Sequence, residues 1–249
     1  MKGEAAALQA GGDPRAATRR RDSLAPIGRE SINERVYAEL RRSLIHGVLE
    51  AGEVLRIADL SERLQTSTMP VREALARLVS EQALEALPSR SVRVPLITRE
   101  RLDDLARARC LVEGELVRLA LPNLGPEDFA GLRELTVATE AVFAGDAADR
   151  AQATSELNHA FHFHIYHAAG SAVLIPIVES LWLQSGPYVR RAARIHQEVG
   201  RRQAVHHHWA LIEALERRDA AATVASLVSD ITHSFDLIRD RIAREGQDG

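Results

Sequence analysis

The sequence predicts a mostly α-helical fold, and three observations support this prediction. Only 15 glycines and 9 prolines occur among 249 residues, too few for a fold built on many tight β-turns. Apolar residues recur at helical spacing along most of the chain from Ile32 onward. The hydrophobic share of 45% and the charged share of 27% are typical of a globular protein with a buried core.

Composition also excludes several classes of protein. No apolar run approaches the ~18 residues of a membrane span. The N-terminus lacks the apolar core of a signal peptide. The single cysteine, Cys110, cannot form an internal disulfide, which suits a reducing compartment. We therefore expect a cytoplasmic protein that has no contact with a membrane.

The N-terminal part begins with a tail and two helices. Residues 1–30 are rich in alanine, glycine and arginine and show no apolar periodicity, so we expect a disordered, solvated tail. The first helix begins at Ile32 and ends before Gly47. After a turn, a short second helix carries Leu60 and Leu64 on one face.

A third helix and a hairpin follow. Ser67 or Thr68 can cap this helix, because a hydroxyl accepts a hydrogen bond from the free amides of the first turn. Pro70 fits the same turn, because proline has no amide hydrogen to donate. Residues 84–94 predict a β-hairpin with a basic tip at Arg90.

This order of elements is that of a winged helix-turn-helix with three helices and a small β-hairpin. We assign it to residues 31–97 and call them the N-terminal module. The third helix of such a unit fits the major groove of DNA, and the hairpin can enter the neighbouring groove. The module is therefore predicted to bind DNA.

The rest of the chain, residues 98–244, is predicted to form an all-α bundle of six or seven helices, the C-terminal module. Helix-forming residues dominate, and turn-forming residues interrupt them at intervals. The predicted breaks lie at residues 122–126, 145–146, 170–171, 186–187, 200 and 218–219.

The formal charge of −3 is unevenly distributed. It combines +2 in residues 1–30, 0 in residues 31–98 and −5 in residues 99–249. An acidic total therefore does not exclude DNA binding, but the neutral N-terminal module has to bind DNA through arginines on one face. For the tail, residues 1–30, the alternative role is that of an arm that contacts DNA.

The N-terminal module resembles the DNA-binding domain of GntR-family bacterial transcription regulators. The most specific match is the run Pro-Val-Arg-Glu-Ala-Leu at residues 70–75. The family usually has glycine at the positions of Gln65, Gln82 and Ser91, and arginine at that of Thr68. The resemblance implies that four residues contact operator DNA: Ser67, Thr68, Arg72 and Arg90.

The C-terminal module resembles the FCD effector domain of the FadR subfamily, with matching motifs over residues 158–171 and 208–220. Imidazoles that converge from separate helices with a carboxylate are a usual shell for zinc or nickel. The resemblance implies a divalent metal ion bound by four residues: Asn158, His162, His208 and Asp230. His233, one turn beyond Asp230, is the alternative ligand, and a hydrogen-bonded core histidine is the alternative role for each imidazole.

Arg109 is the candidate effector-binding residue. The resemblance places it on the first helix of the C-terminal module, where its guanidinium can bind a carboxylate. The alternative is an ion pair with Glu113, four residues further on. Trp182, Arg190 and Arg194 are further candidates for the cavity wall. Five other histidines of this module are expected on polar faces: His159, His164, His167, His206 and His207.

Together these observations predict a metabolite-responsive transcription regulator rather than an enzyme. We expect a homodimer on a palindromic operator, because one recognition helix reads too few bases for a specific address. A small organic acid bound at the metal is expected to relieve repression. A metal-dependent hydrolase or lyase is the first alternative, although no zinc-protease or nucleophile–base motif is present. An interaction module with a vestigial helix-turn-helix is the second.

Overall fold

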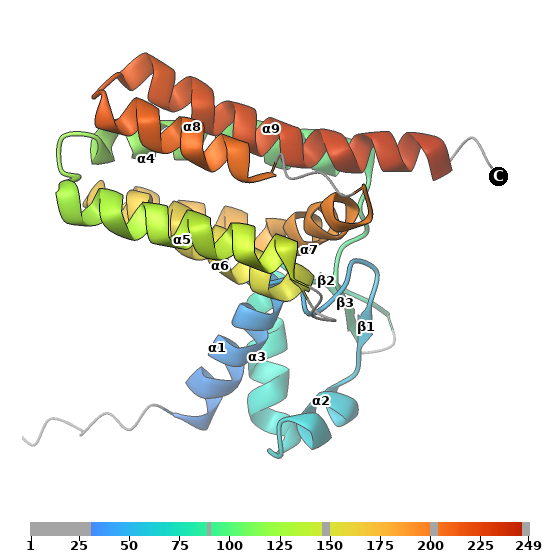
Figure 1. Ribbon diagram of the computed structural model, residues 1–249. Helices are drawn as coiled ribbons and strands as arrows, with labels where there is room; N and C mark the ends of the chain where they lie inside the picture. Colours follow the sequence, from blue (N-terminus) through green and yellow to red (C-terminus); the bar gives the residue numbers. More distant parts are fainter. Residues whose placement is uncertain (1–30, 89–90, 146–149, 200–203, 246–249) are drawn as a thin grey trace, which may run out of the picture. The chain divides into compact units, whose positions relative to one another are not determined.

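The computed structural model describes residues 31–88, 91–145, 150–199 and 204–245. The chain divides into Met1–Ser31 and Ile32–Gly249, and the fold below belongs to the second unit. The predicted tail and the wing tip at Arg90 lie outside the described residues. Within the described residues, helices dominate and one small sheet is present, which confirms the predicted fold class (Figure 1).

Three helices and a small sheet form the N-terminal module. The helices are α1 (Ile32–Ile45), α2 (Ile57–Arg63) and α3 (Thr68–Ser80). The strands are β1 (Val54–Leu55), β2 (Glu85–Ala86) and β3 (Val92–Arg93), antiparallel in the order β1-β3-β2. The apolar faces of the helices meet in one buried cluster around Leu44, Val71 and Leu78.

The strand β1 is absent from the sequence prediction, because two residues are too few to show an alternating pattern. Backbone hydrogen bonds hold it beside the hairpin. The Gly52 amide donates to the Val94 carbonyl at 2.9 Å, and the Val94 amide donates to the Glu53 carbonyl at 3.0 Å. The two strands of the predicted wing therefore belong to a three-stranded sheet, in which β3 is the central strand.

The described part of the C-terminal module contains six helices, within the predicted number. They are α4 (Arg99–Ala120), α5 (Pro126–Ala144), α6 (Arg150–Ala168), α7 (Leu174–Val199), α8 (Ala204–Glu216) and α9 (Ala220–Glu245). In Figure 1, α8 lies beside α9 and α5 lies beside α6. Large aromatic side chains fill the space between them, and Phe161, Trp182 and Phe235 are buried.

The predicted break at residues 186–187 is wrong, because α7 continues through Gly186 and Pro187. A Cβ atom on Gly186 would lie only 1.9 Å from the carbonyl oxygen of Leu44, so glycine lets α7 lie directly on the end of α1. Leu183 of α7 also belongs to the buried cluster of the N-terminal module. Packing on both sides of α7 outweighs the backbone hydrogen bond that Pro187 cannot make.

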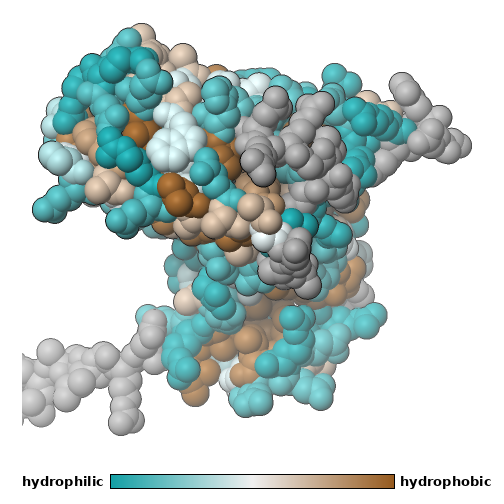
Figure 2. All heavy atoms as spheres, viewed as in Figure 1, coloured by the Kyte–Doolittle hydropathy of each residue, from teal (hydrophilic) through white to brown (hydrophobic). Residues whose placement is uncertain are grey.

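Hydrophilic side chains cover most of the face shown in Figure 2. Hydrophobic side chains appear there in small groups, including over the helices of the N-terminal module. Among the described helices, none combines the length and apolarity that a bilayer crossing requires.

Candidate metal centre and nucleic-acid interface

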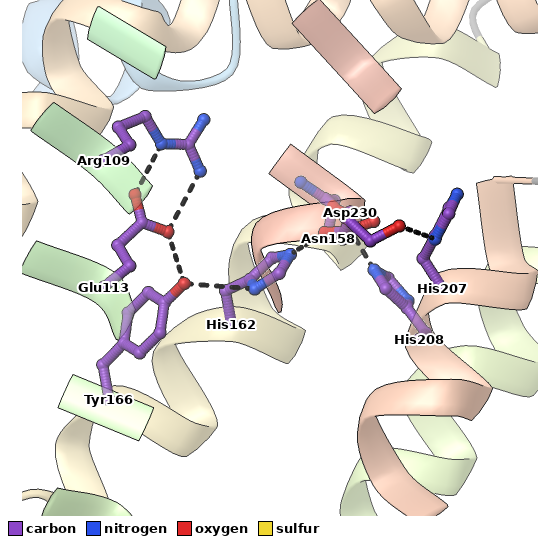
Figure 3. A network of polar contacts seen from close by, with 9 residues as sticks. Arg109, Glu113, Asn158, His162, Tyr166, His207, His208 and Asp230 are labelled. Carbon is purple, nitrogen blue, oxygen red and sulfur yellow. Dashed lines mark hydrogen bonds and ion pairs between the residues drawn. The ribbon is translucent and has the colours of Figure 1, made fainter. Parts of the chain in front are cut away.

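Three buried side chains form a candidate metal centre in the C-terminal module. His162 comes from α6, His208 from α8 and Asp230 from α9, and one ligand atom of each lies within 4.8 Å of the others. Asn158, one turn before His162, places its Oδ1 atom 3.1 Å from Nε2 of His208 (Figure 3). The structure thus brings the four predicted residues together from three helices.

Tyr166, which sequence reasoning did not select, sets how His162 presents its ring. The Tyr166 hydroxyl donates to the Glu113 carboxylate and lies 3.2 Å from Nδ1 of His162. Because the hydroxyl proton of Tyr166 is used in the bond to Glu113, the Tyr166 oxygen accepts a hydrogen bond from Nδ1–H of His162. The other ring nitrogen of His162, Nε2, lies 3.0 Å from Oδ2 of Asp230. A proton on Nε2 makes this contact a hydrogen bond, and a metal ion can take the place of that proton. This geometry therefore fits a cation.

Burial and neighbouring groups set the charges of the cluster. Burial lowers the pKa of His208 to about 4, so its ring is neutral near pH 7. Burial raises the pKa of Asp230, but the hydrogen bond and the charge of His162 outweigh this effect and hold that pKa below its usual range. A neutral imidazole and an ionised carboxylate are the forms that metal ions bind. The cluster could therefore hold a divalent cation.

A cavity of about 40 Å³ adjoins the cluster, and two members of the cluster, His208 and Asp230, line it. The hydroxyls of Thr154 and Ser155 also lie along it, and both are buried without a hydrogen-bond partner among the described residues. His233, the alternative ligand, lines the same cavity and lies outside the three-residue cluster. Because buried polar atoms normally have partners, these groups point to water or a polar ligand in the cavity.

Arg109 is engaged within the module. Its guanidinium donates to both oxygens of Glu113, from Nε at 2.5 Å and from Nη2 at 3.2 Å, and both side chains are buried. It also lies 4.3 Å from the centre of the Trp182 ring. This is the ion pair that the spacing offered as the alternative, so contact between Arg109 and an effector stays a prediction that requires the pair to open.

The two faces of α7 have different neighbours. Arg190 and Arg194, predicted for the cavity wall, instead line a separate hollow beside the end of α1, where Arg194 pairs with Glu50 at 2.9 Å. Four other residues of α7 line the cavity: Val189, Ala192, Ala193 and His196. One helix thus forms a wall of the cavity and a support for the N-terminal module.

Two further histidines differ in their surroundings. His159, expected on a polar face, stacks on Phe163 with ring centres 4.1 Å apart and meets Trp182 edge-on. Burial there lowers the pKa of His159 to about 3, so the expectation of a solvated ring is wrong. His164 pairs with Asp128 at 3.0 Å.

A larger hollow of about 680 Å³ lies between α1, α3, α6 and α7. Its arginines already pair with carboxylates: Arg41 with Glu179, Arg42 with Glu39 and Arg77 with Glu81. A carboxylate ligand would have to displace one of these partners. One lining atom of this hollow, Nδ1 of His46, is buried without a partner among the described residues, whereas the smaller cavity has several such atoms. The smaller cavity is therefore the better candidate for a ligand site.

The predicted DNA-binding residues of α3 lie at the surface. Ser67 occupies the N-cap position without making a side-chain cap hydrogen bond, and both Ser67 and Thr68 are exposed. Arg72 is exposed and makes no ion pair with the described residues. The fourth residue, Arg90, lies outside them. The three described side chains are thus available to an external partner.

Two of the positions where glycine is usual in the family have an unusual backbone conformation in this chain. Gln65, before α3, has φ of 50°, and Gln82, after it, has φ of 59°. Both lie in the left-handed region, where glycine is favoured because a Cβ atom crowds the following carbonyl. The turns on both sides of α3 therefore keep a glycine-like geometry with a larger residue.

Two family models match the chain. The model of the FCD domain matches residues 104–233, about half of the chain. The model described as bacterial regulatory proteins, gntR family, matches residues 32–94. The chain belongs to the GntR family. It is a transcription regulator with a helix-turn-helix and an FCD domain, and not an enzyme.

Individual relatives agree with this assignment. The HTH-type transcriptional regulator McbR of Escherichia coli is 33% identical over 189 residues, 76% of this chain and 84% of that protein. The transcriptional repressor GlaR of Escherichia coli is 31% identical over 147 residues, 59% of this chain and 67% of that protein. The structure of E. coli McbR/YncC superposes with a TM-score of 0.77 at 29% identity, covering 85% of this chain and 99% of that one.

Proposed function

We propose that this GntR-family member is a ligand-controlled repressor of the FadR subfamily. It binds a palindromic operator in the cytoplasm as a homodimer and releases DNA when a small organic acid binds at a divalent metal ion. The observation that carries the proposal is the buried cluster of His162, His208 and Asp230 beside a polar cavity. The similarity to GlaR, which is a repressor by its printed name, favours repression over activation.

The cluster and Asn158 would hold the ion with two imidazole nitrogens, one carboxylate oxygen and one amide oxygen. Zinc and nickel both accept such a donor set. The ion would supply positive charge and open coordination positions for the carboxylate of an organic acid. Tyr166 supports this role, because a partner on the outer ring nitrogen orients a ligating histidine.

Signal transfer to DNA is assigned to α7. A cavity of about 40 Å³ holds a few water molecules, so a metabolite can enter only when a wall moves. The wall formed by α7 carries Gly186 and Leu183, which contact the N-terminal module on its other face. A ligand that fits only the displaced position of α7 shifts the equilibrium between two geometries, and DNA affinity follows if they bind DNA unequally.

DNA binding is assigned to α3 and the wing. The hydroxyls of Ser67 and Thr68 lie at the N-terminus of α3, where a phosphate is favoured. Arg72 can donate two hydrogen bonds to a guanine edge, and Arg90 at the wing can reach the neighbouring groove. Two copies of the module on two half-sites give a palindromic operator.

Metal analysis of protein purified without chelator tests the site. We expect about one zinc or nickel ion per chain in the wild type. His208→Ala should lose the ion, whereas His206→Ala, which removes an exposed imidazole from the same helix, should keep it. Wild-type protein without metal, or a His208→Ala variant with a full complement, contradicts the proposed centre.

A thermal-shift screen of organic acids, with and without added zinc, tests ligand control. A ligand that binds the folded state raises the unfolding temperature. We expect one class of acid to stabilise the metal-loaded wild type, to leave His208→Ala unchanged and to release bound DNA. An acid that stabilises both proteins equally contradicts a metal-dependent ligand site.

A further inference from the structure

One stripe of α3 carries exposed side chains that have no partner within the described chain. Met69, Arg72 and Ala76 are exposed, and Met69 retains 61% of its accessible surface. Their spacing of three and four residues places them on one face of the helix. The opposite face is buried in the core of the N-terminal module, so this stripe is the face that α3 offers to a partner.

The charged residues beside the stripe are held inside the module. Glu73 accepts a hydrogen bond from the side chain of Asn33. Arg77 pairs with Glu81 at 3.1 Å and lies 3.6 Å from the centre of the Tyr37 ring. The free stripe therefore consists of one cation with an apolar side chain on each side.

The first turn of α3 makes the methionine prominent. Thr68 has a short side chain, and Pro70 and Val71 are buried, so Met69 is the only long exposed side chain of that turn. Pro70, directly after it, is buried and anchors the helix start. Met69 therefore projects from a fixed backbone rather than from a loose end.

We infer that Met69 reads DNA sequence by packing against the 5-methyl group of a thymine beside the base that Arg72 contacts. This inference deepens the proposed function and rests on it. In the major groove the thymine methyl is the apolar feature, and apolar side chains distinguish it from cytosine. Side chains three residues apart on a helix lie about 5–6 Å apart, and neighbouring bases are stacked about 3.4 Å apart, so the two residues reach adjacent or next-adjacent bases.

The test starts from DNA that the full-length protein selects from a random-sequence duplex pool. In the best duplex, each thymine is replaced in turn by deoxyuridine, which removes the methyl group alone. For the wild type, we expect one thymine per half-site whose replacement weakens binding about fourfold, the factor for one buried methyl-sized group. For Met69→Ala, we expect weaker binding to the thymine duplex and equal binding to the two duplexes at that position.

Leu111→Ala is the matched control, because it removes an exposed apolar side chain from α4, far from α3 in the sequence. It should discriminate thymine from deoxyuridine as the wild type does, and all three proteins should unfold at similar temperatures. Wild-type protein that selects a sequence but ignores every methyl group overturns the inference and leaves the proposed function intact. So does Met69→Ala protein that still discriminates. Failure to select any sequence overturns the proposed function itself.

Discussion

Arg72 and Arg109 show how differently two regions of this molecule treat the same residue type. Both arginines lie on helices, and the family resemblance implies a ligand contact for each. Arg72 lies exposed on α3 and has no ion pair within the described chain. Arg109 is buried on α4 and donates two hydrogen bonds to Glu113. The comparison teaches that an external ligand can use only the polar groups that the fold leaves free.

The difference extends to whole surfaces. The stripe of α3 has few internal partners, so binding DNA costs it little internal structure. In the C-terminal module, Glu113, Tyr166, His162 and Asp230 form one connected chain of polar contacts. A ligand that disturbs one member disturbs the others, because each holds its neighbour's orientation. The first region is therefore suited to reading a sequence and the second to switching.

Gly186 lies where α7 of the C-terminal module contacts the end of α1 of the N-terminal module. Replacing it tests how closely the two modules are packed. Gly186→Ala places a Cβ atom against the Leu44 carbonyl and should lower the free energy of unfolding by about 3 kcal/mol, as overpacking does. Gly114→Ala is the control, because its Cβ atom would meet Val224 at an ordinary 3.5 Å. Urea unfolding measures both. Equal stability of Gly186→Ala and wild type contradicts the close contact of α7 with α1.

Arg72 and Arg77 provide the sharpest comparison within α3. Arg72→Ala should weaken binding to the selected DNA about 10- to 100-fold, because the proposed bidentate base contact is lost. Arg77→Ala should weaken it much less, since Arg77 is held by Glu81 and Tyr37. Fluorescence anisotropy at fixed salt measures both affinities. Equal losses would show that internal pairing does not determine which arginine contacts DNA.

Tyr166 tests the connected network of the C-terminal module. Tyr166→Phe removes the hydroxyl that orients His162 and should weaken metal binding about tenfold, the usual effect of losing such a support. Tyr188→Phe is the control, because the Tyr188 hydroxyl contacts the Leu96 carbonyl at 3.5 Å and the Arg101 side chain, and neither belongs to the metal cluster. Competition with a chelator measures the affinity. A tenfold loss in both variants, or in neither, contradicts the orienting role.

Acid should destabilise the folded protein through the half-buried imidazole of His159. Its pKa is about 3 in the folded protein, below the usual histidine value, so the unfolded chain takes up a proton first as the pH falls. The stabilising contribution is complete above about pH 6.5 and decreases toward pH 3, by up to about 1 kcal/mol per pH unit. His159→Phe should show a shallower decline in thermal-unfolding scans from pH 7 to 5. An unchanged decline contradicts the burial of a neutral ring.

The smallest expected effect concerns the turns that flank α3. Gln65→Gly and Gln82→Gly should each raise the free energy of unfolding by about 0.5–1 kcal/mol, because glycine tolerates positive φ. Gln184→Gly, inside α7, should instead lower it by about 1 kcal/mol. Urea unfolding distinguishes the two signs. A loss of stability at residues 65 and 82 contradicts the left-handed turns.

Local patterns predicted the helices, because each amphipathic helix repeats its apolar spacing over several turns. They failed at α7, where Gly186 and Pro187 are typical of a turn but contact with α1 keeps the helix intact. They also missed β1, whose two residues pair only through a strand far along the chain. Both failures come from tertiary contacts that a short window of sequence does not contain.

The candidate site was partly predictable from the sequence. Family motifs selected Asn158, His162, His208 and Asp230, and the structure places them together. Tyr166 follows His162 by four residues, so helical spacing alone could have selected it as a neighbour. The state of Arg109 was not predictable, because its spacing fits both a pair with Glu113 and a free guanidinium, and only burial distinguishes them.

The carboxylate of Asp230 has a consequence for electroneutrality. It carries the only full negative charge among the described residues that line the cavity, and the nearby pair of Arg109 and Glu113 is neutral as a unit. A divalent cation on the cluster would therefore leave one positive charge in a buried space. A monocarboxylate cancels that charge, whereas a dicarboxylate adds an unbalanced negative one. For the proposed metal-dependent effector, charge balance would thus favour monoanionic acids over dianionic acids of similar size.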